Sequence, residues 1–389
     1  MSRQGKPIAK IPSRRLTKAS SSPTVRGLAP LLAQIRALVS GARQAAAATA
    51  NALHVRTNFE IGRRIVEHEQ HGSKRAGYGD AVLSSLSTRL TTEFGRGFSI
   101  ANLEYMRRFY LEWRDRSPRL PWLTAIPQKA SGESRARVPA IPQKASGELV
   151  LPGVLSWSHY VLLLTISDLA ERSFYEIEAA REGWSLPELK RQVASCLYER
   201  LALSRNRRRV AELSTKGQVI ARPEDLLKEP LILEFLGLGD HSAYSESDLE
   251  SAIITQIERF LLEIGKGFLF EARQKRFTFD EDHFFVDLVF YNRLLRCYVL
   301  IDLKLDKLTH QDLGQMQMYV NHFDRTVRQP DENPTVGIVL CKRKKQALVE
   351  LTLPKGANIH ASEYQLYLPS KALLRRKLLD WTRDAEAGV

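Results

Sequence analysis

Two short apolar runs decide the fold of this chain: Val286-Asp287-Leu288-Val289-Phe290 and Tyr298-Val299-Leu300-Ile301-Asp302-Leu303-Lys304. Each run has the composition of a β-strand and carries one acid, and the second adds a lysine two positions after its acid. Side chains at i and i+2 share one face of a strand, so Asp302 and Lys304 project together. If the two strands are neighbours in one sheet, Asp287 reaches the same place. Two carboxylates and an ammonium at a strand end can hold a divalent cation and activate a water for phosphodiester hydrolysis.

A further carboxylate could come from the helix that precedes these strands. Apolar residues at helical spacing predict this helix over 246–264. It offers Glu263 next to its end and Glu258 a turn and a half earlier, and either acid could help to place the metal or the water. The sequence leaves the choice between the two open.

The helix predicted over 309–322 adds a polar pair, Gln315 and Tyr319, at i and i+4. The pair could contact water, metal or phosphate together, and a simple polar edge of an amphipathic helix is an equally good interpretation. Acids within apolar strands need a partner. Asp287 could therefore pair with an arginine such as Arg273 in place of a metal.

Composition points to a polyanionic partner. The 389 residues include 58 Lys and Arg against 44 Asp and Glu, which gives a net charge of +14. Such a balance favours nucleic acid as the partner, with a merely basic surface as the alternative. Three widely spaced cysteines argue against a disulfide framework and fit a reducing, cytoplasmic location. No apolar run is long enough to cross a membrane, and no Walker A motif, dinucleotide fingerprint or G-x-S-x-G motif is present.

Two basic clusters are candidates for contacts with the phosphate backbone, and solvated surface charge is the alternative. They lie at the end of the helical half and after the last predicted strand, and consist of Arg205, Arg207, Arg208, Arg209, Lys342, Arg343, Lys344 and Lys345.

The chain divides by composition into an all-α half and a half with α/β/α layout. The segment Ala125–Glu133 recurs at Ala140–Glu148 within a proline-rich stretch, which indicates an inserted surface loop. The predicted parts are a disordered basic tail (1–29), a helical domain (30–213) with its proline-rich insertion (117–153), a linker (214–245), a catalytic domain (246–375) and a C-terminal tail (376–389).

Motifs of a known family occur along both halves of the chain. They are Phe260–Phe268, Arg273-Gln274, Asp287–Tyr291, Asp302-Leu303-Lys304, Gly314-Gln315-Met316, Tyr319, Ile61–Glu67, Tyr78-Gly79, Phe94–Ser99, Leu155–Tyr160 and Trp184-Ser185. The acids and the lysine resemble the PD-(D/E)xK nuclease superfamily, and the whole set is similar to its YhcG-like branch, in which a DUF1016-type helical domain precedes the nuclease domain. Asp302 stands where that pattern frequently has Glu, and both acids occur in the superfamily. The similarity covers about residues 30–375.

The resemblance implies a restriction-endonuclease-like α/β/α domain with a central mixed sheet of four to five strands. It also implies dependence on Mg²⁺. Together with the basic composition, this leads us to expect cleavage of DNA that depends on Mg²⁺ or Mn²⁺. Asp287, Asp302 and Glu263 would hold the metal, while Lys304 would align the water and Gln315 would support the site. Two alternative functions stay open at this point: a nucleic-acid-binding or assembly protein that keeps the fold without cutting, and a nuclease that acts on RNA. A homodimer as the working form also stays open.

Overall fold

The computed structural model describes residues 28–71, 76–115, 155–204, 207–239, 244–279, 281–354 and 356–387. The chain forms two compact units, Met1–Thr49 and Ala50–Val389. Helix α1 (Leu28–His71) begins in the first unit and continues into the second. The proline-rich insertion and nearly all of the predicted basic tail lie outside the described residues. No helix in the described ranges is long and apolar enough to cross a bilayer.

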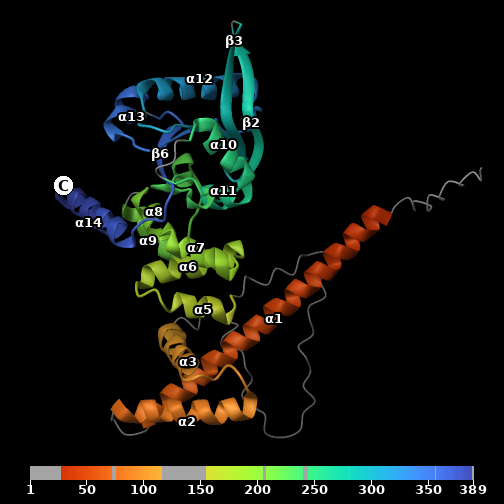
Figure 1. The fold of residues 1–389 in the computed structure, drawn as a ribbon, viewed down its shortest axis with the longest axis vertical. Coiled ribbons are helices and arrows are strands. Elements are labelled where there is room, and N and C mark those ends of the chain that lie inside the picture. Colours follow the sequence, from red (N-terminus) through yellow and green to blue (C-terminus); the bar gives the residue numbers. More distant parts are fainter. Residues whose placement is uncertain are drawn as a thin grey trace, which may run out of the picture. The chain divides into compact units, whose positions relative to one another are not determined.

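The first half of the large unit is helical, as the sequence predicts (Figure 1). Sequence signals set several helix starts: Ser99 caps α3, and Ser185 with Glu188 forms a capping box on α7. Besides α1, the helices of this half are α2 (Ala76–Phe94), α3 (Ile100–Trp113), α5 (Trp157–Leu163), α6 (Leu169–Glu182), α7 (Leu186–Ala194), α8 (Leu197–Leu203) and α9 (Arg207–Lys216).

Aromatic side chains form the core of these helices. The Phe109 ring lies 4.7 Å from that of Tyr160, 4.9 Å from that of Trp113 and 5.4 Å from that of Trp157, centroid to centroid. All four side chains are buried. Because Trp157 and Tyr160 are core residues, they are not available to contact a nucleic-acid base.

The second half is built on one mixed sheet of six strands in the order β1-β6-β5-β4-β3-β2. β2, β3 and β4 are antiparallel neighbours, whereas β4, β5, β6 and β1 run parallel. The sheet has six strands where four to five are expected, because β6 and the two-residue β1 carry too little periodic signal to be predicted from the sequence. The strands are β1 (Leu231–Ile232), β2 (Phe268–Phe279), β3 (Asp282–Asn292), β4 (Cys297–Leu303), β5 (Val336–Cys341) and β6 (Ile359–Gln365).

Helices cover both faces of this sheet. α12 (His310–Thr326) packs on one face through Leu313, Met316 and Phe323. α10 (Glu246–Thr255) and α11 (Ile257–Ile264) pack on the other. The sequence predicts α10 and α11 as one helix, but the chain leaves helical geometry at Gln256, with φ −111° and ψ 32°. α13 (Gln346–Thr352) lies between β5 and β6 in the chain.

The described parts of the segments predicted as a linker and a tail contain regular structure. Residues 214–245 include the short 3-10 helices η2 (Pro223–Leu226) and η3 (Glu234–Leu236) and supply β1 to the edge of the sheet. Helix α14 (Lys371–Ala387) contacts α8, and ion pairs join Lys371 and Arg375 to Glu171. The helical and sheet regions of the large unit are therefore joined by packing and charge, in addition to the chain itself.

Candidate active site

The sheet brings Asp287 and Asp302 together, as their strand positions predict. β3 and β4 pair from Leu288 to Asn292, and Leu288 lies opposite Ile301. The Oδ2 atom of Asp287 accepts a hydrogen bond from the backbone N–H of Leu303 at 2.8 Å, one residue after Asp302. The two carboxylates also interact electrostatically. Arg273, the alternative partner of Asp287, donates instead to Glu250 at 2.9 Å.

Asp302 and Lys304 form the centre of the site. The Nζ atom of Lys304 lies 2.9 Å from Oδ2 of Asp302, whose side chain is only 3% exposed. That oxygen lacks a hydrogen-bond donor in good geometry among the described residues. Burial, together with the nearby charge of Asp287, raises the pKa of Asp302 to about 7 even though Lys304 opposes the shift. The carboxylate pair therefore holds more negative charge than one ammonium compensates.

Lys304 is a stable cation in these surroundings. Burial lowers its pKa, but Asp302, Glu246 and Asp287 outweigh burial and raise it above the usual value. Glu246 lies at the start of α10, with Oε2 3.8 Å from Nζ of Lys304. An ammonium that keeps its proton can donate hydrogen bonds to a water or to a phosphate oxygen, and it is not a proton acceptor.

Gln274 links α10 to the site and was not singled out from the sequence as a functional residue. Its Nε2 atom donates to Asp287 at 3.0 Å and to Glu250 at 2.6 Å. Its backbone has φ +46°, a conformation that non-glycine residues rarely adopt. Glu250 is itself buried. The available signal was the Arg273-Gln274 pair, which stands among the residues that carry the family resemblance.

The polar pair on α12 also faces the site. Gln315 donates a hydrogen bond to the hydroxyl of Tyr319. Burial raises the pKa of Tyr319, and the charges of Asp302 and Asp287 add to the rise. The hydroxyl thus lies within the electric field of both acids and keeps its proton at neutral pH.

Glu263 has a different environment from that expected. It lies at the end of α11 with no exposed surface, and its Oε1 atom accepts from Arg200 at 2.5 Å and from the backbone N–H of Ile232 at 3.0 Å. Arg191 approaches Oε2 at 3.2 Å. These contacts use both carboxylate oxygens, so the structure does not bring Glu263 to Asp302. The alternative acid, Glu258, is exposed on α11.

The basic clusters divide into engaged and exposed side chains. Arg209 pairs with the buried Asp225, and Lys344 pairs with Glu229. Arg343 and Lys345 are exposed beyond the end of β5, which runs parallel to β4 and ends at the same edge of the sheet as Asp302. Lys342 in that loop lies over the ring of Tyr244. Arg205 lies outside the described residues, as do the side chains of Arg207 and Arg208.

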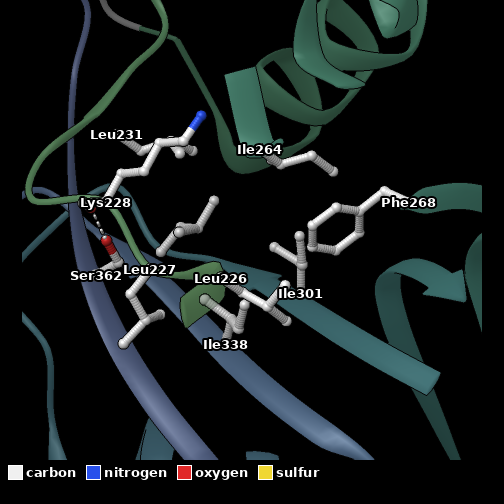
Figure 2. A pocket seen from close by; sticks show the side chains of 10 residues that line it. Leu226, Leu227, Lys228, Leu231, Ile264, Phe268, Ile301, Ile338 and Ser362 are labelled. Carbon is white, nitrogen blue, oxygen red and sulfur yellow. Dashed lines mark hydrogen bonds between the residues drawn. The ribbon is translucent and has the colours of Figure 1, made fainter. Parts of the chain in front are cut away.

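A separate cavity lies between η2 and the sheet (Figure 2). Its volume is about 20 Å³, enough for roughly one water. Apart from Lys228 and Ser362 its walls are apolar, and the Nζ atom of Lys228 donates to the backbone carbonyl of Glu263. The cavity is too small for a nucleotide, and none of its lining residues belongs to the site around Asp302.

Comparison with known proteins identifies the family. Residues 34–200 match the DUF1016 N-terminal domain, and residues 224–379 match the YhcG PDDEXK nuclease domain. The chain is 38% identical over 360 residues to a protein of Escherichia coli (strain K12) described as "Putative nuclease YhcG", covering 90% of this chain and 93% of that protein. The chain belongs to the YhcG family.

Two solved structures are also similar to this YhcG-family chain. One is a repair endonuclease from Pyrococcus abyssi, with 18% identity and a TM-score of 0.23 over 33% of this chain and 50% of that chain. The other is the EndoMS-dsDNA2 complex, with 16% identity and a TM-score of 0.24 over 34% of this chain and 51% of that chain.

The donor set of the YhcG-family site fits a hard divalent cation. Asp302 offers a buried carboxylate oxygen 2.9 Å from the Lys304 ammonium, and Asp287 is a second carboxylate beside it. Mg²⁺ and Mn²⁺ take oxygen ligands and are commonly held by one or two carboxylates together with water and phosphate. Within the described ranges, no group of three or more His, Cys, Asp or Glu residues could hold a metal. Asp287 and Asp302 are therefore the two side chains that would hold such a cation.

Proposed function

We propose that this chain is a nuclease that hydrolyses DNA phosphodiester bonds with Mg²⁺ or Mn²⁺. The observation that carries the proposal is the buried oxygen of Asp302 beside Asp287 and Lys304, where negative charge is left without enough compensation. A cation bound there would polarise the phosphate and lower the pKa of a water. Asp287 and Asp302 would hold it.

Each remaining side chain has a role that follows from its contacts. Lys304, which stays an ammonium, would orient the attacking water and stabilise charge on the phosphate oxygens. Gln274 and the backbone N–H of Leu303 fix the orientation of Asp287. Gln315 orients the Tyr319 hydroxyl next to the carboxylates. Glu263 takes the role of a structural acid in this proposal.

A nucleic acid is the proposed substrate because cations lie at the edge of the sheet that carries the site, and the cleavage panel below separates DNA from RNA. Arg343 and Lys345 are exposed beyond β5, beside the end of β4. The whole chain carries a net charge of +14. Phosphate contacts of this kind give an affinity that falls as salt concentration rises.

A cleavage panel tests the proposal. Supercoiled, linear and branched DNA, and single- and double-stranded RNA, are incubated with the full chain in Mg²⁺, Mn²⁺ or EDTA. We expect DNA products that require the metal and that fall at least 100-fold in Lys304→Ala and Asp302→Asn. Glu258→Gln, which changes an exposed carboxylate on α11, is the matched control and should cut like the wild type.

The alternatives appear as distinct outcomes of this panel. Binding without any metal-dependent product would mean that the chain keeps the fold but does not cut. Products from RNA alone would mean that the chain is a nuclease that acts on RNA. Cleavage that survives Lys304→Ala would place the chemistry outside the site described above.

A further inference from the structure

The strands β2 and β3 continue beyond the rest of the sheet as a two-stranded ribbon. β2 and β3 pair along their whole length, whereas β4 pairs with β3 only over residues 288–292. Residues 275–279 and 282–286 therefore pair with each other and have no third strand beside them among the described residues. Figure 1 shows this part of β2 and β3 projecting past α12. The ribbon starts at Gln274 and Asp287, which belong to the active site.

One face of the ribbon is fixed to α12. The ring of Phe277 stacks on that of His322 at 4.1 Å and meets the ring of Tyr319 edge-on at 5.6 Å. Phe284 stacks on Phe277 at 5.5 Å, and Val286 is buried. Because this face is packed, the ribbon keeps a fixed position relative to the site.

The opposite face is open and leads to the catalytic acids. Arg276 lies opposite Phe285, and Thr278 lies opposite His283, with Oγ1 of the threonine 3.0 Å from Nδ1 of the histidine. All four side chains are exposed. Because two residues of a strand span about 7 Å, Phe285 lies about one such step from Asp287.

The chemistry of this face suits a nucleic-acid strand. Among the described residues Arg276 has no carboxylate partner, and the side chain of Phe285 is 43% exposed. A cation beside an exposed aromatic ring can hold one phosphate and stack one unpaired base. Glu281 and Asp282 are exposed at the tip and would repel phosphate, so binding is confined to the base of the ribbon.

We infer that the open face of the ribbon binds an unpaired stretch of the DNA strand next to the bond that is cut. Phe285 stacks on a base and Arg276 contacts a phosphate. The inference rests on the proposed function. It makes DNA with unpaired nucleotides, such as single strands, flaps and bubbles, the preferred substrate over fully paired duplex.

Binding without metal tests this inference separately from cleavage. Fluorescence anisotropy of the full chain in EDTA measures affinity for a labelled single-stranded oligonucleotide and for the matching duplex. We expect tighter binding of the single strand, and a loss of about tenfold in Phe285→Ala with little change for duplex. Phe285→Trp should keep the affinity. Phe279→Ala is the matched control, since Phe279 is 70% exposed at the tip on the other face.

The salt dependence gives a second, independent readout. Arg276→Ala should reduce the slope of log affinity against log salt by about 0.7 for the single strand. Wild-type affinity for Phe285→Ala, or equal preference for duplex, would overturn the inference, as would the absence of any nucleic-acid binding. A chain that never cuts, but loses single-strand binding in Phe285→Ala, would refute the proposed function and leave the ribbon assignment intact.

Discussion

Glu263 and Asp302 are both buried carboxylates beside cations, yet their surroundings have opposite effects on ionisation. Burial alone would raise the pKa of Glu263, but Arg200, Lys228 and Arg191 outweigh burial and lower it to about 2. Asp302 has Lys304 as a cation and Asp287 as a competing acid, and its pKa rises to about 7. A surplus of cations makes a structural ion cluster, and a deficit leaves room for a metal.

The largest effect on stability is expected when the ion cluster around Glu263 loses its buried arginine, Arg200. Arg200→Met removes the 2.5 Å contact to Glu263 and two contacts to Ser195. We expect the free energy of unfolding to fall by about 3–5 kcal/mol, because an acid is left buried with too little compensation. Urea denaturation measures it. Arg259→Met, at an exposed position of α11, is the control. A loss below about 1 kcal/mol, within the range of surface substitutions, would contradict the structural role.

Removing the charge of the acid itself should also destabilise this cluster. Glu263→Gln is expected to cost about 3 kcal/mol at pH 7. The folded pKa near 2 lies below the reference value of 4.5, so the wild-type advantage is present above pH 4.5 and is lost as the pH falls towards 2. Denaturation curves at pH 7 and pH 3 should show the difference shrinking. A constant difference would mean that shape, and not charge, is responsible.

The same amide substitution at Asp302 should change the free energy of unfolding in the opposite direction. The folded pKa of Asp302 lies above the reference value of 3.8, so its ionisation costs stability as the pH rises from about 4 to 7. Asp302→Asn should therefore stabilise the metal-free chain at pH 8 by about 2 kcal/mol. The gain should vanish near pH 4. Thermal unfolding in EDTA measures both values, and destabilisation at pH 8 would refute the claimed charge deficit.

A smaller effect is expected from the residue that orients Asp287. Gln274→Ala removes the hydrogen bonds to Asp287 and Glu250. Cleavage should slow by about 10–100-fold, as is usual when a group that orients a metal ligand is lost. Gln346→Ala, at an exposed position of α13, should leave the rate unchanged. Equal rates for both variants would remove Gln274 from the site.

The sequence was sufficient to place Asp287, Asp302 and Lys304 together. Acids within apolar strands stand out because burial demands a partner, and the i, i+2 spacing fixes the shared face. The polar pair on α12 could be found for the same reason, since helical spacing is a local property. The site residues found in this way lie on two neighbouring strands and one helix, whose local patterns are visible in the sequence.

The role of Glu263 could not be found in this way. Its partner Arg200 lies 63 residues earlier in the chain, and no local pattern connects them. The break at Gln256 also turns α10, which carries Glu246 and Glu250, towards the site. A prediction that treats 246–264 as one unbroken helix therefore selects Glu263 at its end, whereas the acids near the site lie at its start. Long-range pairing and a two-residue strand such as β1 leave almost no trace in the sequence.

Calorimetric titration of Mg²⁺ or Mn²⁺ into the full chain is the most direct test of the charge deficit at Asp302. The wild type should bind the metal at pH 8 and more weakly at pH 6, because the proton and the metal compete for the same carboxylate. Asp302→Asn should lose binding, and Glu258→Gln should keep it. Equal metal binding by the wild type and Asp302→Asn, or none by either at pH 8, would contradict the account.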